Sequence, residues 1–368
     1  MRSQKISFLS AASLILVCGI VCQGQPADQK ILFPIEKDGE WGFIDRSGKL
    51  VISVQFDSAN EFHEGLALVT AGEKKLFIDA SGRVVMEPKF DIVNDFSEGL
   101  AAVNIGETRI ANIGLIANPG KWGYIDKSGA LVLPMKFTHA ENFSEGLAAV
   151  TLGDRDHGAF IDHAGKIAFE IPLDVTLGFH EGVAGVLLNG SIIYYDRKGK
   201  KIPISTEYGP KSNSFSDGLL PIEVKSKWGF VDRTGKIVIE PRFEDADNFS
   251  DGLAAVKVRG EETIWCPRDE NGSREGFTMK WGYIDKTGKL VIPAQFESAS
   301  PFSEGLAEIH QCDKSFFIDK TGKTVLSGNF RYASSFAAGL ARVSIMRNGK
   351  LLESYIDKSG KIIWDPMK

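Results

Sequence analysis

The feature that most constrains this chain is an Asp-x-x-Gly motif that recurs nine times between residues 41 and 360. Successive aspartates lie 34 to 53 residues apart, and most of the steps are 34 to 38 residues. A period of this length predicts one repeat array, and it overrides chain length as a guide to domain number. The aspartates are Asp45, Asp79, Asp126, Asp162, Asp196, Asp232, Asp285, Asp319 and Asp357.

A second motif, Phe-Ser-Glu-Gly-Leu, accompanies the first in eight variants. Its phenylalanine follows the preceding aspartate by 17 residues in seven cases and by 19 in one. The variation in unit length therefore lies between the Gly-Leu pair and the next hairpin. The phenylalanines are Phe62, Phe96, Phe143, Phe179, Phe215, Phe249, Phe302 and Phe336.

Each unit has the composition of three short β-strands. Leu147 to Thr151, Trp122 to Asp126 and Leu131 to Leu133 are examples, rich in β-branched or aromatic residues and bounded by turn residues. The Asp side chain can accept from its own backbone two residues on, and the Gly accommodates the left-handed conformation of a short hairpin loop. The sequence therefore predicts an all-β fold of nine three-stranded meanders, with the aromatic side of the Trp-Gly strand packed between units.

The two ends of the array bear on its overall shape. Ile31 to Phe33 supplies a first strand before Trp41, and Lys361 to Trp364 supplies a third strand after Asp357, so nine whole units are in phase. A closed propeller often divides one blade between the two chain ends. Without that division we favour an open or strongly curved β-solenoid, and a propeller-like toroid is the alternative.

Residues 1–24 have the pattern of a cleaved secretory signal peptide. Arg2 and Lys5 precede an apolar run from Phe8 to Val21, which is too short for a membrane span. Lipoprotein anchoring at Cys22 or Cys18 is the alternative. Residues 25–368 then form a single exported array with 41 basic and 48 acidic residues and no membrane span, a charge balance that disfavours nucleic acid as a partner.

Two cysteines remain after cleavage, Cys266 and Cys312. They lie in corresponding parts of consecutive units, so stacking could bring them together, and an oxidising compartment would allow a disulfide. Two partly buried free thiols are the alternative.

No recognised catalytic, cofactor or metal motif is present. The chain lacks a Gly-x-Ser-x-Gly elbow, a phosphate-binding loop and a dinucleotide fingerprint, and its six histidines show no zinc spacing. The nine aspartates fit turn chemistry better than a ladder of calcium ions. The acidic residue of Phe-Ser-Glu-Gly recurs too often to be catalytic, and we expect it to form a turn or strand-start hydrogen bond. We predict no catalytic residue and no cofactor.

Two insertions, at residues 106–120 and 259–279, lengthen the same part of their units and should project from the same rim. Insertions in repeat arrays often mark a binding face. The second insertion is the better candidate for a partner-binding loop, although a neutral surface loop would also fit. Its candidate residues are Trp265, Arg268, Asp269, Glu270 and Arg274.

The segments from Lys121 to Gly129, Lys227 to Gly235 and Lys280 to Gly288 resemble the WG repeats, also called KWG repeats, of bacterial proteins. The resemblance covers nearly the whole exported chain and implies an all-β repeat protein, often exported. It implies no catalytic residues.

Three functions remain open. We favour a non-enzymatic exported scaffold that binds a protein or glycan partner. A cell-wall or carbohydrate-binding module using the repeated aromatics is the second hypothesis, and complete burial of Trp41, Trp122, Trp228 and Trp281 would count against it. An enzyme with a site assembled between units is the third.

Overall fold

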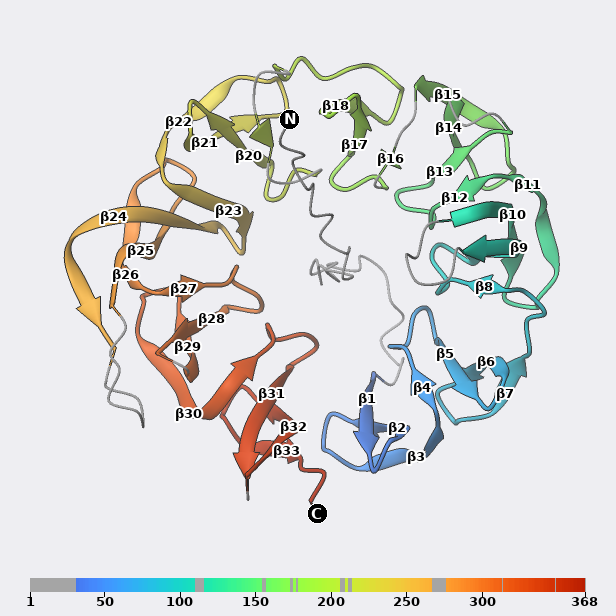
Figure 1. Ribbon diagram of the computed structural model, residues 1–368, viewed down its shortest axis with the longest axis horizontal. Coiled ribbons are helices and arrows are strands. Elements are labelled where there is room, and N and C mark those ends of the chain that lie inside the picture. The colour runs from blue at the N-terminus through green and yellow to red at the C-terminus, as the bar shows by residue number, and fades with distance from the viewer. Residues whose placement is uncertain are drawn as a thin grey trace, which may run out of the picture.

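Antiparallel β-sheets arranged in a ring make up the regular structure of the chain (Figure 1). The computed structural model describes residues 31–109, 116–153, 157–172, 175–176, 178–205, 209–210, 214–266, 276–312, 314–347 and 349–367. Within these ranges every regular element is a strand, so the predicted all-β class is confirmed. No helix in them is long and apolar enough to cross a membrane.

Two long strands form the centre of each unit and are joined by a hairpin. The first long strands are β1 (Leu32–Lys37), β5 (Leu66–Ala71), β9 (Leu100–Arg109), β13 (Ala148–Thr151), β17 (Val183–Leu188), β20 (Leu219–Val224), β24 (Leu253–Trp265), β28 (Leu306–Gln311) and β31 (Leu340–Arg347). The second are β2 (Glu40–Asp45), β6 (Lys74–Asp79), β10 (Ile116–Asp126), β14 (His157–Ile161), β18 (Ser191–Asp196), β21 (Lys227–Asp232), β25 (Gly276–Ile284), β29 (Lys314–Asp319) and β32 (Lys350–Asp357).

An outer strand follows the Asp-x-x-Gly turn in most units. These strands are β3 (Leu50–Phe56), β7 (Val84–Met86), β11 (Leu131–Phe137), β15 (Ile167–Pro172), β22 (Ile237–Phe243), β26 (Leu290–Phe296), β30 (Thr324–Ala333) and β33 (Ile362–Trp364).

A short strand nearest the ring axis adds a fourth member to most sheets, which the three-stranded prediction missed. These strands are β4 (Ser58–Ala59), β8 (Ile92–Val93), β12 (His139–Ala140), β16 (Val175–Thr176), β19 (Gly209–Pro210), β23 (Asp245–Ser250) and β27 (Ser298–Ala299). Most contain only two residues, too few for a period-two pattern to be visible in the sequence. The long strand β30 serves two units, since it is the outer strand beside β29 and the innermost strand beside β31.

The glycine of the Trp-Gly pair lies opposite a bulge that leaves no space for a Cβ at that position. In β10 and β11, Trp122 is paired with Phe137 and Tyr124 with Leu133, so the outer strand carries two extra residues opposite Gly123. A Cβ on Gly123 would lie 2.6 Å from the carbonyl oxygen of Leu133. The same shift occurs beside the other three Trp-Gly pairs and also beside Phe316 in β29, whereas Ala159 lies in a regularly paired stretch of β14.

The hydrophobic core lies between neighbouring sheets. The aromatic residue two positions before each aspartate packs against the phenylalanine of the next unit's Phe-Ser-Glu-Gly motif, as Tyr124 does with Phe143. Eight such pairs have ring centroids 4.8 to 6.0 Å apart. Edge-to-face and tilted aromatic pairs contribute beyond their buried area. Stacking between units therefore supplies the core, as the alternation in the sequence predicts.

The ends of the array contact each other, and the open solenoid that we favour from the sequence did not include this contact (Figure 1). Phe33 of β1 packs on Tyr355 of β32 with ring centroids 5.6 Å apart, and both belong to one buried cluster with Ile35, Ile44 and Leu340. Phe33 thus takes the place of a motif phenylalanine. We call this junction between β1–β3 and β31–β33 the seam. In the described residues no strand pairing crosses the seam.

Candidate functional site

The recurring acidic residue of Phe-Ser-Glu-Gly joins one unit to the next. Each carboxylate accepts a hydrogen bond from the backbone N–H of the motif glycine one unit later, as Glu304 does from Gly339 at 3.0 Å. Each acidic residue also has a positive φ near 50°. The predicted turn hydrogen bond therefore connects neighbouring units. Its acceptors are Glu64, Glu98, Glu145, Glu181, Asp217, Asp251 and Glu304.

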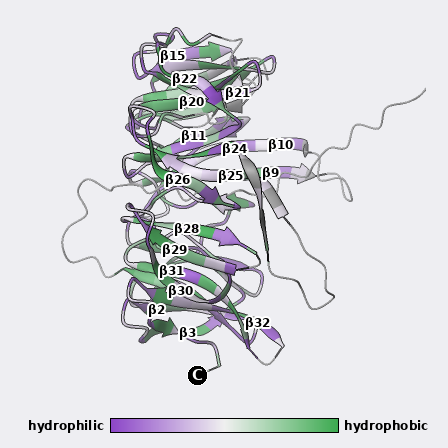
Figure 2. Ribbon diagram, turned by 90° about the vertical axis from the view of Figure 1, so that its left-hand side faces the viewer, coloured by the Kyte–Doolittle hydropathy of each residue, from purple (hydrophilic) through white to green (hydrophobic). Residues whose placement is uncertain are grey.

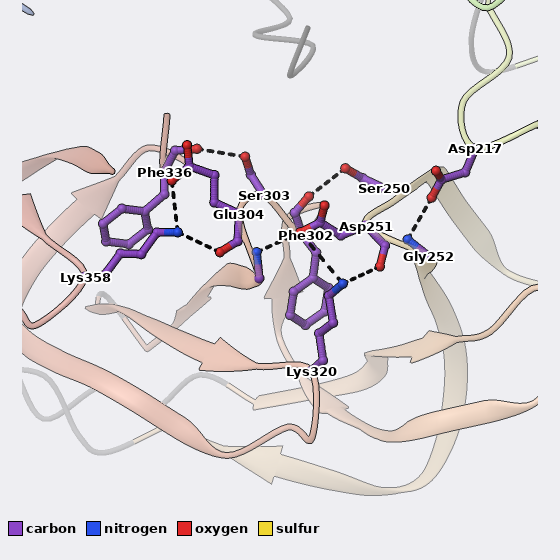
Figure 3. A network of polar contacts seen from close by, with 11 residues as sticks. Asp217, Ser250, Asp251, Gly252, Phe302, Ser303, Glu304, Lys320, Phe336 and Lys358 are labelled. Atoms are coloured by element: carbon purple, nitrogen blue, oxygen red, sulfur yellow. Dashed lines mark hydrogen bonds and ion pairs between the residues drawn. The ribbon is translucent and has the colours of Figure 1, made fainter. Parts of the chain in front are cut away.

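The motif serine forms a second link in the same direction. The hydroxyl of Ser303 donates to the carbonyl oxygen of Phe336 in the next unit at 2.7 Å, and Ser250 donates to that of Phe302 at 2.6 Å (Figure 3). His180 replaces the serine in its own unit, and its Nδ1 lies 2.7 Å from the carbonyl oxygen of Phe215. His180 therefore contacts the same backbone carbonyl position that the motif serine contacts in other units.

A basic side chain from the following hairpin, a lysine or arginine in four units and a histidine in one, completes the junction. Figure 3 shows Lys358 beside Glu304 and Lys320 beside Asp251, at nitrogen–oxygen distances of 3.0 and 3.9 Å. The basic residue follows the aspartate of Asp-x-x-Gly directly in sequence, and the other pairs are Lys127–Glu64, His163–Glu98 and Arg233–Glu181. Because these side chains are partly exposed, each pair contributes little stability by itself. The recurring charged residues thus lie paired at the junctions between units.

The aspartates of the Asp-x-x-Gly turns accept hydrogen bonds from the residue two positions later, as the sequence predicts for turn residues, and from the residue four positions later. The carboxylate of Asp79 accepts from the hydroxyl and backbone N–H of Ser81 and from the backbone N–H of Arg83. The Ser81 hydroxyl bond is the main cause that lowers the pKa of Asp79 from 3.8 to about 2. These bonds favour the charged form of the carboxylate. Turn formation accounts for the aspartates without a bound ion.

The two predicted insertions form the long hairpins β9–β10 and β24–β25. They occupy the same slot between the first and second long strands, and they extend to the same side of the ring (Figure 2). Figure 1 shows them on opposite sides of the ring opening. Trp265 is the last residue of β24, whereas Arg268, Asp269, Glu270 and Arg274 lie outside the described residues, as do residues 1–24 with Cys18 and Cys22.

The two cysteines form a bonded pair, and Cys266 lies at the loop end of the β24–β25 hairpin, directly after Trp265. The Sγ atoms of Cys266 and Cys312 are 2.04 Å apart, and the bond closes a segment of 46 residues. The carboxylate of Glu297 accepts from the backbone N–H of Cys312 at 2.9 Å. The hairpin is thereby tied to the next unit at the β28–β29 turn.

The four Trp-Gly tryptophans differ in exposure. Trp122 and Trp281 are buried, at 6% and 9% of their full exposed area, whereas Trp41 and Trp228 are half-buried. Burial is therefore incomplete across the set. These four tryptophans therefore do not form the series of equivalent exposed clefts that the glycan hypothesis requires.

A hollow with a volume of about 510 Å³ lies at the seam, and we call it the seam hollow. Half-buried Trp41 of β2 lines it from the first sheet, and half-buried Trp364 of β33 lines it from the last. Buried Ile35 and Tyr355 also contribute to its wall. Glu353 lines it as well, and it occupies the position four residues before Asp357 where other units carry tryptophan.

Charged groups of both signs surround the seam hollow. Arg342 lies over the Tyr355 ring and 3.6 Å from a Glu353 carboxylate oxygen. Arg347 pairs with buried Asp365 at 2.6 Å. Burial raises the pKa of Tyr355, so its hydroxyl stays protonated and donates to the buried carbonyl of Pro34 at 3.0 Å. These residues come from the two chain ends, so sequence inspection of single units did not find them.

A second polar cluster lies within β28 and β29. Ser315 is 1% exposed and donates to the carboxylate of Glu308 at 2.6 Å, and Ser300 donates to the other oxygen at 2.9 Å. His310 Nδ1 lies 3.3 Å from the Ser315 hydroxyl oxygen. Because the serine is buried and its proton is directed to the glutamate, the cluster satisfies a buried carboxylate and does not present a nucleophile.

Comparison with protein families gives repeated matches along the chain. Six segments match the model of the WG containing repeat, and together they cover more than half of the chain. The matched residues are 41–74, 77–108, 122–155, 228–261, 281–310 and 316–350. No curated protein matches the sequence significantly.

Several solved structures resemble the chain weakly. Hsv2 of Kluyveromyces lactis has a TM-score of 0.38 and 9% identity, and the match covers 68% of this chain and 95% of that one. Dihydro-heme d1 dehydrogenase NirN has a TM-score of 0.42, 11% identity and coverages of 78% and 70%. Virginiamycin B lyase of Staphylococcus aureus has a TM-score of 0.30, 15% identity and coverages of 72% and 92%.

Proposed function

Because the chain belongs to the family of WG-containing repeat proteins, we propose that it is a non-enzymatic, exported scaffold that binds a protein partner. The binding surface is the side of the ring that carries the β9–β10 and β24–β25 hairpins. In this proposal the nine copies of the motif each supply one central hairpin of a closed toroid, and the toroid holds the two long hairpins at fixed positions.

The observation that carries the proposal is the placement of these hairpins. They extend beyond the neighbouring sheets on the same side and stand across the ring opening from each other (Figures 1 and 2). Strand β24 contains 13 residues and β10 contains 11, compared with six in most of the other long strands. Two projections on a broad ring suit an extended surface, such as that of a folded protein, better than a small molecule.

The repeated polar residues support a scaffold over an enzyme. The seven motif carboxylates and the basic hairpin side chains that face five of them are used in contacts between units, which leaves them little freedom for chemistry. A catalytic site would require convergent groups at a reacting atom. The disulfide between Cys266 and Cys312 supports export, because such bonds persist in oxidising compartments.

The first experiment compares partner binding by hairpin variants. Residues 259–279 are replaced with a short Gly-Ser turn in one variant and residues 106–120 in another, and proteins that cross-link to the intact protein from the host's exported fraction are identified. Biolayer interferometry with each purified candidate then measures affinity. The proposal expects at least tenfold weaker binding for either replacement, about 1.4 kcal/mol.

The control separates loss of the hairpin from loss of the disulfide. A Cys266→Ser and Cys312→Ser double variant removes the covalent tie and keeps the hairpin residues. It should retain most of the affinity if the hairpin itself contacts the partner. Equal binding by the intact protein and both shortened variants would refute the proposed surface, and turnover of a substrate by the purified protein would refute the non-enzymatic assignment.

A further inference from the structure

The seam hollow differs from every other junction that the structure describes in being lined by both ends of the array. Its walls come from β1, β2 and the turn between them, and from β31, β32, β33 and the residues after β33. Its volume of about 510 Å³ lies within the range of roughly 300 to 1,000 Å³ that is usual for small-molecule sites. From its lining we infer that the seam hollow is a binding site for a neutral sugar.

The two tryptophans supply the apolar surfaces that a sugar requires. Trp41 and Trp364 are both half-buried, and they approach the hollow from opposite sides of the seam. The face of an indole carries partial negative charge. One face of a pyranose ring presents C–H groups with partial positive charge, so it can stack on an indole while its hydroxyls point away. Each of the two indoles that line the hollow therefore offers a surface on which a sugar ring can stack.

The charges around the hollow favour a neutral ligand. Four cationic residues and three carboxylate residues line it, and the buried carboxylate of Asp365 neutralises one of the cations, Arg347. A second cation, Arg342, is paired with Glu353. With the signs nearly balanced, a phosphate group or a metal ion would gain little from the local field. A polyhydroxyl ligand can instead donate to Glu353 and accept from Arg342 or Lys350, which are also lining residues.

A ligand in the seam hollow should also stabilise the contact between the first and last sheets. A sugar that contacts Trp41 and Trp364 touches the first and the last sheet together, so it binds the closed ring better than a ring opened at the seam. Binding to the native state alone raises stability in proportion to the logarithm of ligand concentration. Ligand binding and ring closure should therefore be linked. This inference is independent of the protein partner proposed for the hairpins.

The test is a titration of the purified protein with cellobiose, chitobiose, maltose and mannobiose, followed by tryptophan fluorescence and calorimetry. We expect at least one of these disaccharides to bind at millimolar concentration or below and to raise the melting temperature. Trp364→Leu and Trp41→Leu should each weaken binding at least about tenfold, equivalent to 1.4 kcal/mol. Trp228→Leu is the matched control, since Trp228 holds the same repeat slot as Trp41 and does not line the hollow.

A further variant keeps the test decisive if the tryptophan variants fail to fold. The Glu353 side chain is 66% exposed, so Glu353→Gln should preserve the melting temperature without ligand and still weaken sugar binding. Failure of all four disaccharides to bind would overturn the inference. Tighter binding of inorganic phosphate or digalacturonate, or sugar binding that survives Trp364→Leu and Glu353→Gln together, would overturn it as well.

Discussion

The hydroxyl of Tyr355 donates a hydrogen bond to the carbonyl oxygen of Pro34, 321 residues earlier, at 3.0 Å. At internal junctions, Tyr124 and Tyr283 donate in the same way to Glu141 and Ser300 of the following unit. The last sheet therefore contacts the first through a tyrosine-to-carbonyl hydrogen bond, the same type of contact that joins units adjacent in sequence. A single substitution at Tyr355 can therefore measure how much this contact between the two ends of the array contributes to stability.

Tyr355→Phe should lower the free energy of unfolding by about 1–3 kcal/mol, because it leaves the buried Pro34 carbonyl without its donor. Urea unfolding followed by far-ultraviolet circular dichroism measures the change. Tyr332→Phe is the control, since Tyr332 is 58% exposed and its loss of a hydroxyl should have little effect. Equal stability of Tyr355→Phe and the unmodified protein would argue against the closed ring.

Ala338→Gly should stabilise the protein by about 0.5–1 kcal/mol, because glycine adopts positive φ without the steric cost borne by alanine. Ala338 has a φ of 50° and stands where other units carry the bonding carboxylate. Glu304→Gly should give no such gain, since it also removes the acceptor for Gly339 and the partner of Lys358. Thermal unfolding of both variants decides the point, and stabilisation by both would show that the carboxylate contributes nothing.

Gly123→Ala should destabilise the protein by about 1–3 kcal/mol, the range for a side chain forced into a filled site. Its Cβ would lie 2.6 Å from the backbone carbonyl oxygen of Leu133, which cannot move without disturbing the bulge. Gly153→Ala is the control, because a Cβ there would meet nothing within 4 Å. A melting temperature for Gly123→Ala equal to that of Gly153→Ala would contradict the role assigned to the bulge.

Ser81→Ala should raise the pKa of Asp79, which lies at about 2 in the folded protein against an ordinary value of 3.8. Because folding lowers this pKa, the stability contributed by Asp79 is present above its unfolded value and is lost as the pH falls towards 2. Carboxyl titration by nuclear magnetic resonance measures the shift. Ser128→Ala, in a different turn, should leave the Asp79 pKa unchanged, and an unaltered pKa in Ser81→Ala would disprove the hydroxyl's role.

Local chemistry made much of the architecture predictable. The Asp-x-x-Gly turns follow from short side chains and positive-φ glycines, and the aromatic side of the Trp-Gly strand packs between units because alternation places Trp122 and Tyr124 on one face. The placement of both insertions in one slot follows from the constant spacing of the two motifs. These features depend on residues that are close together in sequence.

The remaining features depend on distant or very short segments. The innermost strand Ser58–Ala59 has two residues, which leaves no periodicity to detect. The sequence indicated a hydrogen bond for Glu304 but could not show that its donor, Gly339, belongs to the next unit. Contact between Phe33 and Tyr355 has no local signal either, so closure and the seam hollow could not be inferred. A contact between the two ends of the array depends on the sum of the rotations between successive units, which no single unit's sequence specifies.

The seam has a consequence for self-association. In the described residues, β1 pairs with β2 and β33 with β32, and no backbone ladder joins the first sheet to the last. The first sheet also packs on the second through the Phe43–Phe62 pair, so an exchange would move it into another molecule where it regains the equivalents of both this contact and the contact to Tyr355. Exchange of identical elements is a low-cost route to dimers. Concentrated protein should therefore populate reciprocally swapped pairs through the same surface that closes each monomer.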